Sequence, residues 1–266
     1  MIDDLNIGII GAGNMGSAII RGIITGYSNN KVMANDIDKS KLNLLQTETG
    51  IKIAESIDEV AHFSDLLVLA VKPDITIKIA AKLKNFSGII ISIAAGVSIN
   101  TIKANAGEDK KIVRAMPNAP VNVKSGMTVM SHTGNLSSNE VDIVKSFFST
   151  VGEVLVMDEK YINAVTAISG SGPAYVFTFL QAMADGGVKL GIPRTEALVL
   201  ASQTILGSIK IFIDKNENPF TLRDKITSPG GTTIEALHVL EKAGFSGIIM
   251  DAIEAAAKKS KELDNL

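Results

Sequence analysis

Short apolar runs alternate with longer helical patterns through the first half of the chain. Residues 66–70 are continuously apolar, and residues 89–94 are apolar except for Ser92, so neither run alternates with polar residues. Continuous apolarity indicates strands buried on both faces, as in a parallel sheet covered by helices. Helical spacing follows the first two runs, at residues 15–24 and 39–49. The predicted strands are 5–10, 31–35, 66–70, 89–94, 111–116, 127–130 and 153–157. This alternation predicts a doubly wound α/β domain.

The pattern changes near residues 158–160, and every later apolar pattern has a helical period. The predicted helices are 161–168, 174–190, 195–213, 232–242 and 247–263. No Gly/Ser-rich or Pro-rich linker separates the two halves. We therefore predict two domains that pack directly on each other, an α/β domain at 1–158 and an all-helical domain at 159–266.

Helices 174–190 and 195–213 carry apolar residues on more than one face. Such helices must be covered on all sides, and a small helical domain has little with which to cover them. A homodimer formed through this half is the simplest cover, because isologous pairing is the commonest assembly. Burial against the first domain is the alternative.

Composition excludes several classes of protein. The chain of 266 residues is 46% hydrophobic and 20% charged, which excludes disorder, and its net charge of −2 argues against a nucleic-acid partner. It has no cysteine, which excludes disulfides and thiolate catalysis. No basic segment precedes an apolar run at the N-terminus, and the longest continuous apolar runs are too short to span a membrane. We expect a cytoplasmic protein without membrane partners.

Residues 11–16 read Gly-Ala-Gly-Asn-Met-Gly, directly after a predicted strand and at the start of a predicted helix. This G-x-G-x-x-G motif in that context predicts a Rossmann-type dinucleotide site. Gly11 allows the tight turn, Gly13 lets the backbone approach the pyrophosphate, and Gly16 lets the helix pack closely on the strand. The helix N-terminus stabilises the phosphate charge.

The choice of dinucleotide depends on the end of the second strand, at Asn35 and Asp36. Asp36 lies 20 residues after Gly16, near the spacing of an acid that binds the ribose of NAD. Lys39 and Lys41 follow and could meet the 2′-phosphate of NADP. Asp36 could equally cap the next helix, so the pattern leaves NAD and NADP open.

Two further loops leave the carboxyl ends of predicted strands, where ligands of open α/β sheets bind. Residues 70–73 read Ala-Val-Lys-Pro, and residues 94–96 read Ala-Ala-Gly. Small side chains in the second loop would let a flat nicotinamide approach the backbone. Ordinary turn chemistry is the alternative for both loops.

Residues 228–233, Ser-Pro-Gly-Gly-Thr-Thr, indicate the mouth of a helix suited to a small carboxylate. Two helix starts compete. Ser228 can cap the helix with Pro229 in its first turn, or Thr232 can cap it with Glu235 in a capping box. Residues 168–173, Ile-Ser-Gly-Ser-Gly-Pro, form a similar helix start. This stretch could be another binding loop or a site of close helix packing at a subunit interface, and we favour packing, with contact to the substrate pocket.

The sequence contains no motif of a conventional catalytic site. The three histidines, His62, His132 and His238, lack metal-ligand spacing, so no metal site is expected. No nucleophile elbow is present either. Any catalysis must therefore come from a cofactor.

From end to end, the chain resembles the pyrroline-5-carboxylate reductase family. The resemblance rests on residues 10–16, 69–73, 92–97, 116–120, 169–175 and 228–233. It implies a Rossmann domain followed by a helical dimerisation domain, with dimers often assembled into a decamer. It also implies reduction of 1-pyrroline-5-carboxylate to L-proline, the last step of proline biosynthesis, by NADPH or NADH. Asp36 departs from the basic or neutral residue that many members place there, which bears on the choice of NADP.

Site residues follow from the motifs and the resemblance together. Ser228, Gly231, Thr232 and Thr233 are expected to bind the substrate carboxylate, and the Thr233 hydroxyl to lie near the ring nitrogen as the catalytic group. The expected cofactor-binding residues are Gly11, Ala12, Gly13, Asn14, Met15, Asn35, Asp36, Ser56, Ala70, Val71, Lys72, Pro73, Ala94, Ala95 and Asn118. The alternatives are a β-hydroxyacid-dehydrogenase-like oxidoreductase and a non-catalytic NAD(P)-binding assembly protein.

Overall fold

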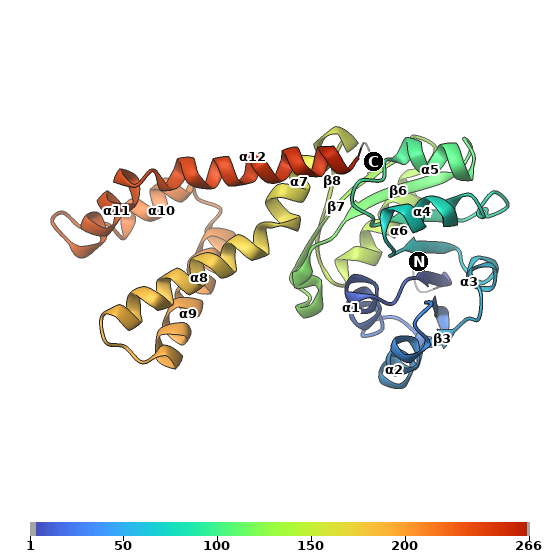
Figure 1. Ribbon diagram of the computed structural model, residues 1–266, viewed down its shortest axis with the longest axis horizontal. Coiled ribbons are helices and arrows are strands. Elements are labelled where there is room, and N and C mark those ends of the chain that lie inside the picture. The colour runs from blue at the N-terminus through green and yellow to red at the C-terminus, as the bar shows by residue number, and fades with distance from the viewer. Residues whose placement is uncertain (1–3, 265–266) are drawn as a thin grey trace. The chain divides into compact units, whose positions relative to one another are not determined.

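The computed structural model describes residues 4–264, and its N-terminal part is a sheet with helices on both faces (Figure 1). Strand order is β3-β2-β1-β4-β5-β6-β7-β8. This order reverses beside β1, as in doubly wound sheets, and confirms the predicted architecture. The strands are β1 (Ile7–Ile10), β2 (Val32–Asn35), β3 (Lys52–Ile53), β4 (Leu66–Leu69), β5 (Ile89–Ser92), β6 (Lys111–Met116), β7 (Gly126–His132) and β8 (Gly152–Val156).

One pair of strands departs from the expected parallel arrangement: β6 and β7 are antiparallel. Only a short connection with a 3₁₀ turn, Ala119–Val123, joins them. A parallel crossover needs about a dozen residues or more, so the chain turns back beside β6.

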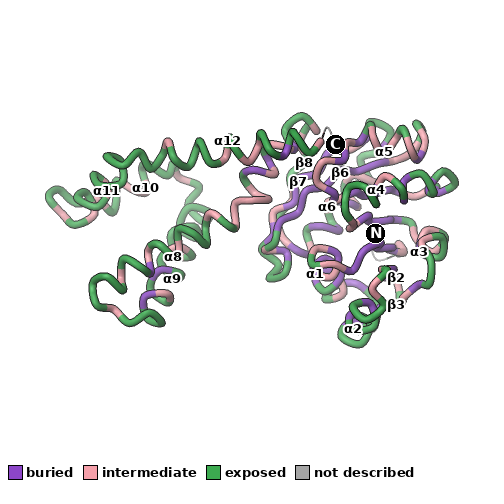
Figure 2. Tube along the Cα trace, in the orientation of Figure 1, coloured by how far each residue is buried: buried purple, intermediate pink, exposed green. Residues whose placement is uncertain are grey.

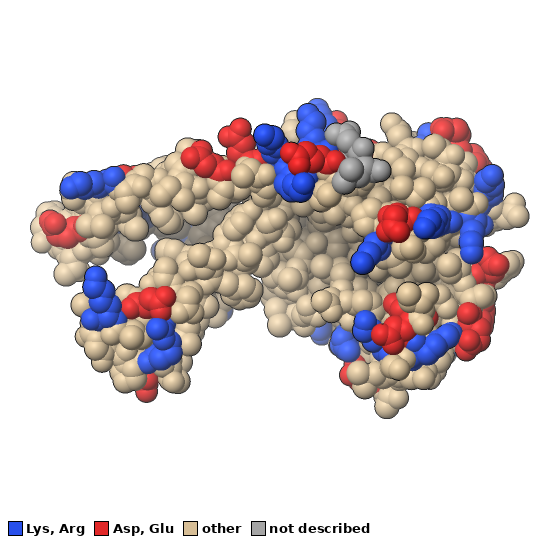
Figure 3. Space-filling model, viewed as in Figure 1, with Lys and Arg blue, Asp and Glu red and all other residues tan. Residues whose placement is uncertain are grey.

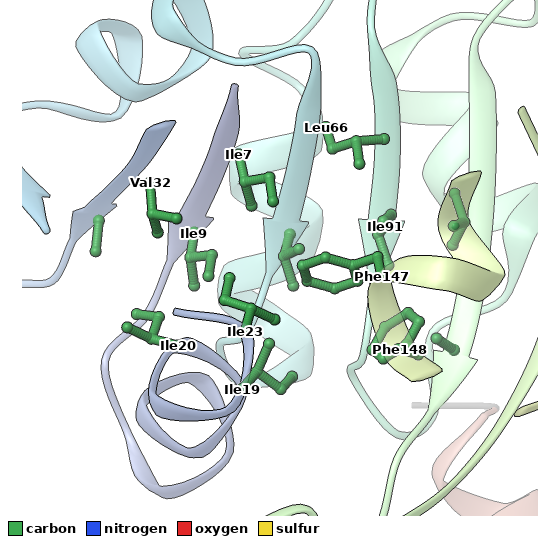
Figure 4. Packing of buried hydrophobic residues seen from close by; sticks show 14 of the residues in the cluster. Ile7, Ile9, Ile19, Ile20, Ile23, Val32, Leu66, Ile91, Phe147 and Phe148 are labelled. Atoms are coloured by element: carbon green, nitrogen blue, oxygen red, sulfur yellow. The ribbon is translucent and has the colours of Figure 1, made fainter. Parts of the chain in front are cut away.

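Neighbouring residues on each strand belong to two different cores. Ile7 and Ile9 of β1 pack with α1 (Asn14–Ile23) and α6 (Ser138–Ser149), as Figure 4 shows, whereas Ile10 packs on the other face. The remaining helices of this part are α2 (Lys39–Thr49), α3 (Ile57–Phe63), α4 (Pro73–Ala80), α5 (Ile99–Ala106) and α7 (Ile162–Val165). Burial on both faces explains why the strands are continuously apolar.

The C-terminal part is helical. Its helices are α8 (Gly172–Lys189), α9 (Arg194–Lys215), α10 (Pro219–Lys225), α11 (Thr232–Lys242) and α12 (Phe245–Leu263). Helix α10 was not predicted, although Asn218 caps it and Pro219 occupies its first turn, a signal present in the sequence. The chain divides into two compact units, a sheet unit that runs to Ser171 and includes the chain from Ala255 onward, and a helical unit, Gly172–Glu254. The domain boundary expected after residue 158 stays a prediction.

Large apolar side chains of the helical unit are exposed in the single chain (Figure 2). On α9 they include Leu206, Ile209 and Ile213. By length and composition alone, α9 is the one helix among residues 4–264 that could cross a membrane, and 11% of its apolar window is buried. Apolar helices that soluble proteins bury satisfy the same test, so this observation leaves open what covers α9.

Candidate active site

The glycine-rich loop has the steric features expected of a dinucleotide cradle. Gly11 has a φ of +105°, and a Cβ there would lie 2.3 Å from the Ala70 carbonyl oxygen. A Cβ on Gly16 would lie 2.0 Å from the Gly11 oxygen, whereas a Cβ on Gly13 would meet nothing within 4 Å. Gly13 is also the N-cap of α1, with no side chain capping the helix. The loop therefore leaves open backbone N–H groups at the position where a pyrophosphate would bind.

Asp36 is tied to this loop. Its carboxylate accepts hydrogen bonds from the Ala12 N–H at 2.5 Å and the Asp38 N–H at 2.8 Å. Helix α2 is capped by Asp38 instead, whose side chain accepts from the N–H groups of Ser40 and Lys41, so the alternative that Asp36 caps this helix is wrong. The reason is that β2 ends at Asn35 and α2 begins only at Lys39, which places Asp38 at the cap.

The two lysines considered for a 2′-phosphate each have an acidic partner. Lys39 pairs with Glu55 at 2.8 Å and Lys41 with Asp38 at 3.3 Å. The Lys41 amide and ammonium groups hold the pKa of the Asp38 carboxyl below its usual range. Asp38 thus adds a second negative charge close to Asp36 in sequence.

A cavity of about 740 Å³ lies beside the glycine-rich loop and the end of β2. The expected cofactor residues among its lining are Gly11, Gly13, Asn35, Asp36, Ala70, Val71 and Lys72. Ile37, which is 99% exposed, and Ile75 add apolar surface suited to a flat base. Ser56 is absent from the lining. Its hydroxyl caps α3 by accepting from the Glu59 N–H at 3.2 Å.

A second cavity, of about 420 Å³, shares Ala70 and Val71 with the first. It brings together six of the expected cofactor residues: Met15, Ala70, Val71, Pro73, Ala94 and Ala95. Its remaining lining was not predicted as cofactor-binding: Ile93, Met116, Pro117, Thr166, Gly170 and Ser171. Gly170 and Ser171 belong to the Gly/Ser-rich stretch for which the sequence favoured close helix packing with contact to the substrate pocket.

Thr166, Gly170 and Ser171 lie on an unusual helical turn. Thr166–Gly170 is a π-helix that follows α7, and the Ser171 N–H donates to the Thr166 carbonyl at 2.8 Å. The buried Asn118 holds this turn by donating to the Ser169 carbonyl at 2.9 Å, and accepts from the Met127 N–H at 2.8 Å. Asn118 is thus engaged within the protein, and its contact with cofactor stays a prediction. π-Turns are frequent at functional sites, but no sequence signal marks this one.

In the helical unit, neither predicted cap of α11 is formed. The N-cap is Gly231, and no side chain caps the helix. Pro229 and the left-handed Gly230, with a φ of +64°, form a turn closed by the Gly231 N–H donating to the Ser228 carbonyl at 3.1 Å. This turn places Ser228 one turn too early to cap the helix, and makes Thr232 its first residue instead of its cap.

The α11 mouth is consequently open. Among residues 4–264, the N–H groups of Thr232 and Thr233 have no hydrogen-bond partner. A Cβ on Gly231 would lie 2.4 Å from Ser228 Oγ, so glycine lets Ser228 close over the turn. Because the Gly231 N–H is occupied by the turn, Thr232 and Thr233 are the main donors for an anion.

The residues present fit a dinucleotide, because glycines shape the loop and two cavities adjoin it at Ala70 and Val71. No cluster of three or more His, Cys, Asp or Glu residues suited to a metal occurs among the described residues. The sheet unit thus provides a place for a cofactor, and the helical unit a place for a small anion.

Comparisons with known proteins cover both units. A family model described as pyrroline-5-carboxylate reductase dimerisation matches residues 159–263, and one described as NADP oxidoreductase, coenzyme F420-dependent, matches residues 6–96. The chain is 40% identical over 265 residues to the pyrroline-5-carboxylate reductase of Escherichia coli (strain K12), covering 97% of each chain.

Solved structures of pyrroline-5-carboxylate reductases are also similar to this chain over nearly its whole length. The chain resembles a pyrroline-5-carboxylate reductase from Coxiella burnetii with a TM-score of 0.92 and 33% identity, covering 97% of this chain and 98% of that one. The Plasmodium falciparum enzyme with NADP bound gives a TM-score of 0.89 at 33% identity, covering 98% and 99%. This chain therefore belongs to the pyrroline-5-carboxylate reductase family of NAD(P)H-dependent oxidoreductases of proline biosynthesis, with an NADP-binding sheet domain and a helical dimerisation domain.

Proposed function

We propose that this chain reduces 1-pyrroline-5-carboxylate to L-proline, with NADPH as the cofactor and NADH as a second one. The observation that carries the proposal is the uncapped mouth of α11, present in the same chain as a glycine-rich dinucleotide cradle. The substrate has one carboxylate and one ring imine. The helix mouth suits the carboxylate, and a bound nicotinamide supplies the hydride that the imine carbon requires.

In this proposal the carboxylate is held by the N–H groups of Thr232 and Thr233, assisted by Ser228. The helix dipole of α11 stabilises the negative charge, and Gly231 adds no side chain to block it. The Thr233 hydroxyl lies near the ring nitrogen, where it orients the imine and relays the proton that the nitrogen must receive. Fixing the ring in this way is the main contribution of the protein, because the chemistry itself belongs to the cofactor.

The cofactor is proposed to lie across the glycine-rich loop. Its adenine and ribose would occupy the 740 Å³ cavity beside Asn35 and Asp36, and its nicotinamide the 420 Å³ cavity beside Ala94 and Ala95. Ala94, Ala95, Met116 and Pro117 in the lining of the second cavity offer small and apolar surface against which a flat nicotinamide could pack. Ser56 and Asn118 stay in the proposed cofactor set through the resemblance.

The match to the dimerisation model implies a homo-oligomer. We propose a homodimer as its unit, with assembly up to a decamer, working in the cytoplasm. The apolar residues left exposed on α8, α9 and α12 support such a contact.

The direct test mixes the purified chain with 1-pyrroline-5-carboxylate and NADPH or NADH, and follows both cofactor oxidation and L-proline. We expect oxidation that depends on the substrate and yields one proline per cofactor oxidised. Thr233→Ala should lower kcat by roughly 100-fold, whereas Thr233→Ser, which keeps the hydroxyl, should stay close to wild type. A folded, cofactor-binding sample without turnover would contradict the function, and a wild-type kcat in Thr233→Ala would contradict only the role of that hydroxyl.

A further inference from the structure

A buried arginine lies behind the second cavity. Arg114 is on β6, two residues before Met116, which lines the cavity, and its side chain is 4% exposed. Its Nη1 donates to Glu159 Oε1 at 3.0 Å, and its Nη2 donates to Asp264 Oδ1 at 2.9 Å. A buried guanidinium requires such partners, because an unpaired buried charge is strongly destabilising. Arg114 therefore joins the sheet to a residue 150 positions later in the chain.

Asp264 also holds α7. Its Oδ2 accepts from the Asn163 side-chain amide at 2.6 Å, and the Asn163 oxygen accepts from the buried Ser260 hydroxyl at 2.6 Å. We call Arg114, Glu159, Asn163, Ser260 and Asp264 the C-terminal clamp. Its members come from β6, the segment before α7, α7 itself, α12 and the residue that follows α12.

The same end of the chain lies against the loop that follows β5. Gly96 has a φ of +77°, and a Cβ there would lie 2.8 Å from the Leu263 carbonyl oxygen. Ala94 and Ala95, immediately before it, line the cavity. The end of the chain thus packs directly on the loop that we assign to the nicotinamide.

These contacts join the segments that carry three walls of the cavity. The first wall is the end of β6, the second is the loop at Ala94 and Ala95, and the third is the π-turn that continues α7. Ala95 and Met116 also pack with Ile162 and Val165 of α7 in one small core. The walls are far apart in sequence, and residues 260–264 contact the segments that carry all three.

We propose that the C-terminal clamp sets the spacing of the nicotinamide cavity, with Asp264 as a positioning residue for hydride transfer. The inference rests on the proposed function, because it assigns this cavity to the nicotinamide. Hydride transfer is sensitive to the position of the reacting atoms, and an error of about 1 Å can cost roughly 100-fold in rate. A clamp that fixes the walls from behind controls that position without touching the cofactor.

The test compares Asp264→Ala with Glu262→Ala, an exposed acid on α12 that pairs with Lys259 on the same helix. Arg114 keeps Glu159 as a partner in Asp264→Ala, so the variant should fold. Three quantities are measured: the Kd of NADPH from nicotinamide fluorescence, the Kd of ADP-ribose 2′-phosphate, which lacks nicotinamide, and kcat. Melting temperature is recorded for each variant.

We expect Asp264→Ala to raise the NADPH Kd about tenfold and to lower kcat roughly 10- to 100-fold, with ADP-ribose 2′-phosphate binding within about twofold of wild type. Ser260→Ala should change the same quantities less, Asp264→Asn should recover much of the loss, and Glu262→Ala should change none. The proposal would be overturned if Asp264→Ala weakened the binding of NADPH and of ADP-ribose 2′-phosphate equally. It would also be overturned if this variant left NADPH affinity and kcat unchanged. If the wild-type protein binds NADPH but shows no turnover, the proposed function fails. The clamp is then still tested by comparing the Kd of NADPH with that of ADP-ribose 2′-phosphate in Asp264→Ala.

Discussion

At the scale of single residues, Asp36 shows how one side chain serves two tasks. Its carboxylate fastens the glycine-rich loop to the end of β2 through the N–H groups of Ala12 and Asp38. It also lines the cavity proposed for the adenosine ribose. A ribose hydroxyl can share that carboxylate, whereas a 2′-phosphate would meet a like charge there.

Replacing Asp36 by Ser should therefore shift the choice of cofactor. We expect the ratio of kcat/KM for NADPH to that for NADH to rise about tenfold, because one negative charge leaves the ribose site. Both constants should fall somewhat, since the bond to Ala12 is weakened. Steady-state kinetics with each cofactor measure the ratio.

Asp38→Ser is the matched control. It removes an equal charge close by in sequence but keeps a side chain able to cap α2, and Asp38 does not line the cavity. An equal shift in that variant would mean that charge at a distance, and not contact with the ribose, sets the preference.

At the scale of elements, the presence or absence of a side-chain cap distinguishes helix starts that serve structure from one that is suited to a ligand. Helix α6 begins with a complete capping box, in which Ser137 and Glu140 satisfy each other's N–H groups. Helix α11, despite its Thr-x-x-Glu sequence, has no side-chain cap. A capped start seals its donors within the chain, and an uncapped start leaves them free for a ligand.

The α6 cap provides a prediction on pH and stability. Glu140 accepts from Lys111 Nζ at 2.5 Å and from the Ser137 N–H at 2.9 Å, and these bonds, with Lys111 the larger cause, hold the pKa of its carboxyl below 4.5. A carboxyl whose pKa is lower in the folded than in the unfolded protein stabilises the fold at pH values above its unfolded pKa. That stabilisation is lost as the pH falls through the folded pKa.

Glu140→Gln keeps the capping geometry and removes only the charge. At pH 7 we expect it to lower the free energy of unfolding by about 0.5 kcal/mol, a small value because the Lys111 side chain is 37% exposed. The difference should shrink below pH 4.5 and vanish once the folded carboxyl is protonated. Urea titrations across this range measure it, with the exposed Glu153→Gln as a control. A difference that is constant with pH would exclude a charge effect.

At the scale of the whole molecule, the apolar surface of the helical unit requires a partner. Leu206 and Ile209 on α9 are 55% and 54% exposed in the single chain. The face in Figure 3 shows a long uncharged surface over α8 as well. The dimerisation family model covers these helices, and burial in an oligomer would offset the cost of exposing this surface to water.

A double substitution, Leu206→Glu with Ile209→Glu, should reduce the oligomer to smaller species, because each glutamate would place a charge in an apolar contact. Light scattering after size-exclusion chromatography measures the mass. NADPH binding should persist, since the cradle belongs to the sheet unit. Lys210→Glu, on the same helix, is the control. An unchanged mass in the double variant would place the interface elsewhere.

Much of the sheet and part of the site could be read from the sequence. The limits predicted for β6, α2 and α11 agree with the structure, because burial repeats with the period of each element. The glycine-rich loop was predictable because its sterics are local. The strand β7 was predicted at residues 127–130, but its antiparallel direction was missed, since direction depends on how the chain packs after β6.

The sequence by itself determined the order of elements, the dinucleotide cradle and the family, because periodicity, turn chemistry and motifs are properties of neighbouring residues. Only the tertiary structure decided which side chains meet across the chain. It directed Asp36 to Ala12 and Asn118 to the π-turn, and it joined Asp264 to Arg114 on the strand whose end lines the second cavity. These contacts join residues from 24 to 150 positions apart, and no local pattern encodes such a distance.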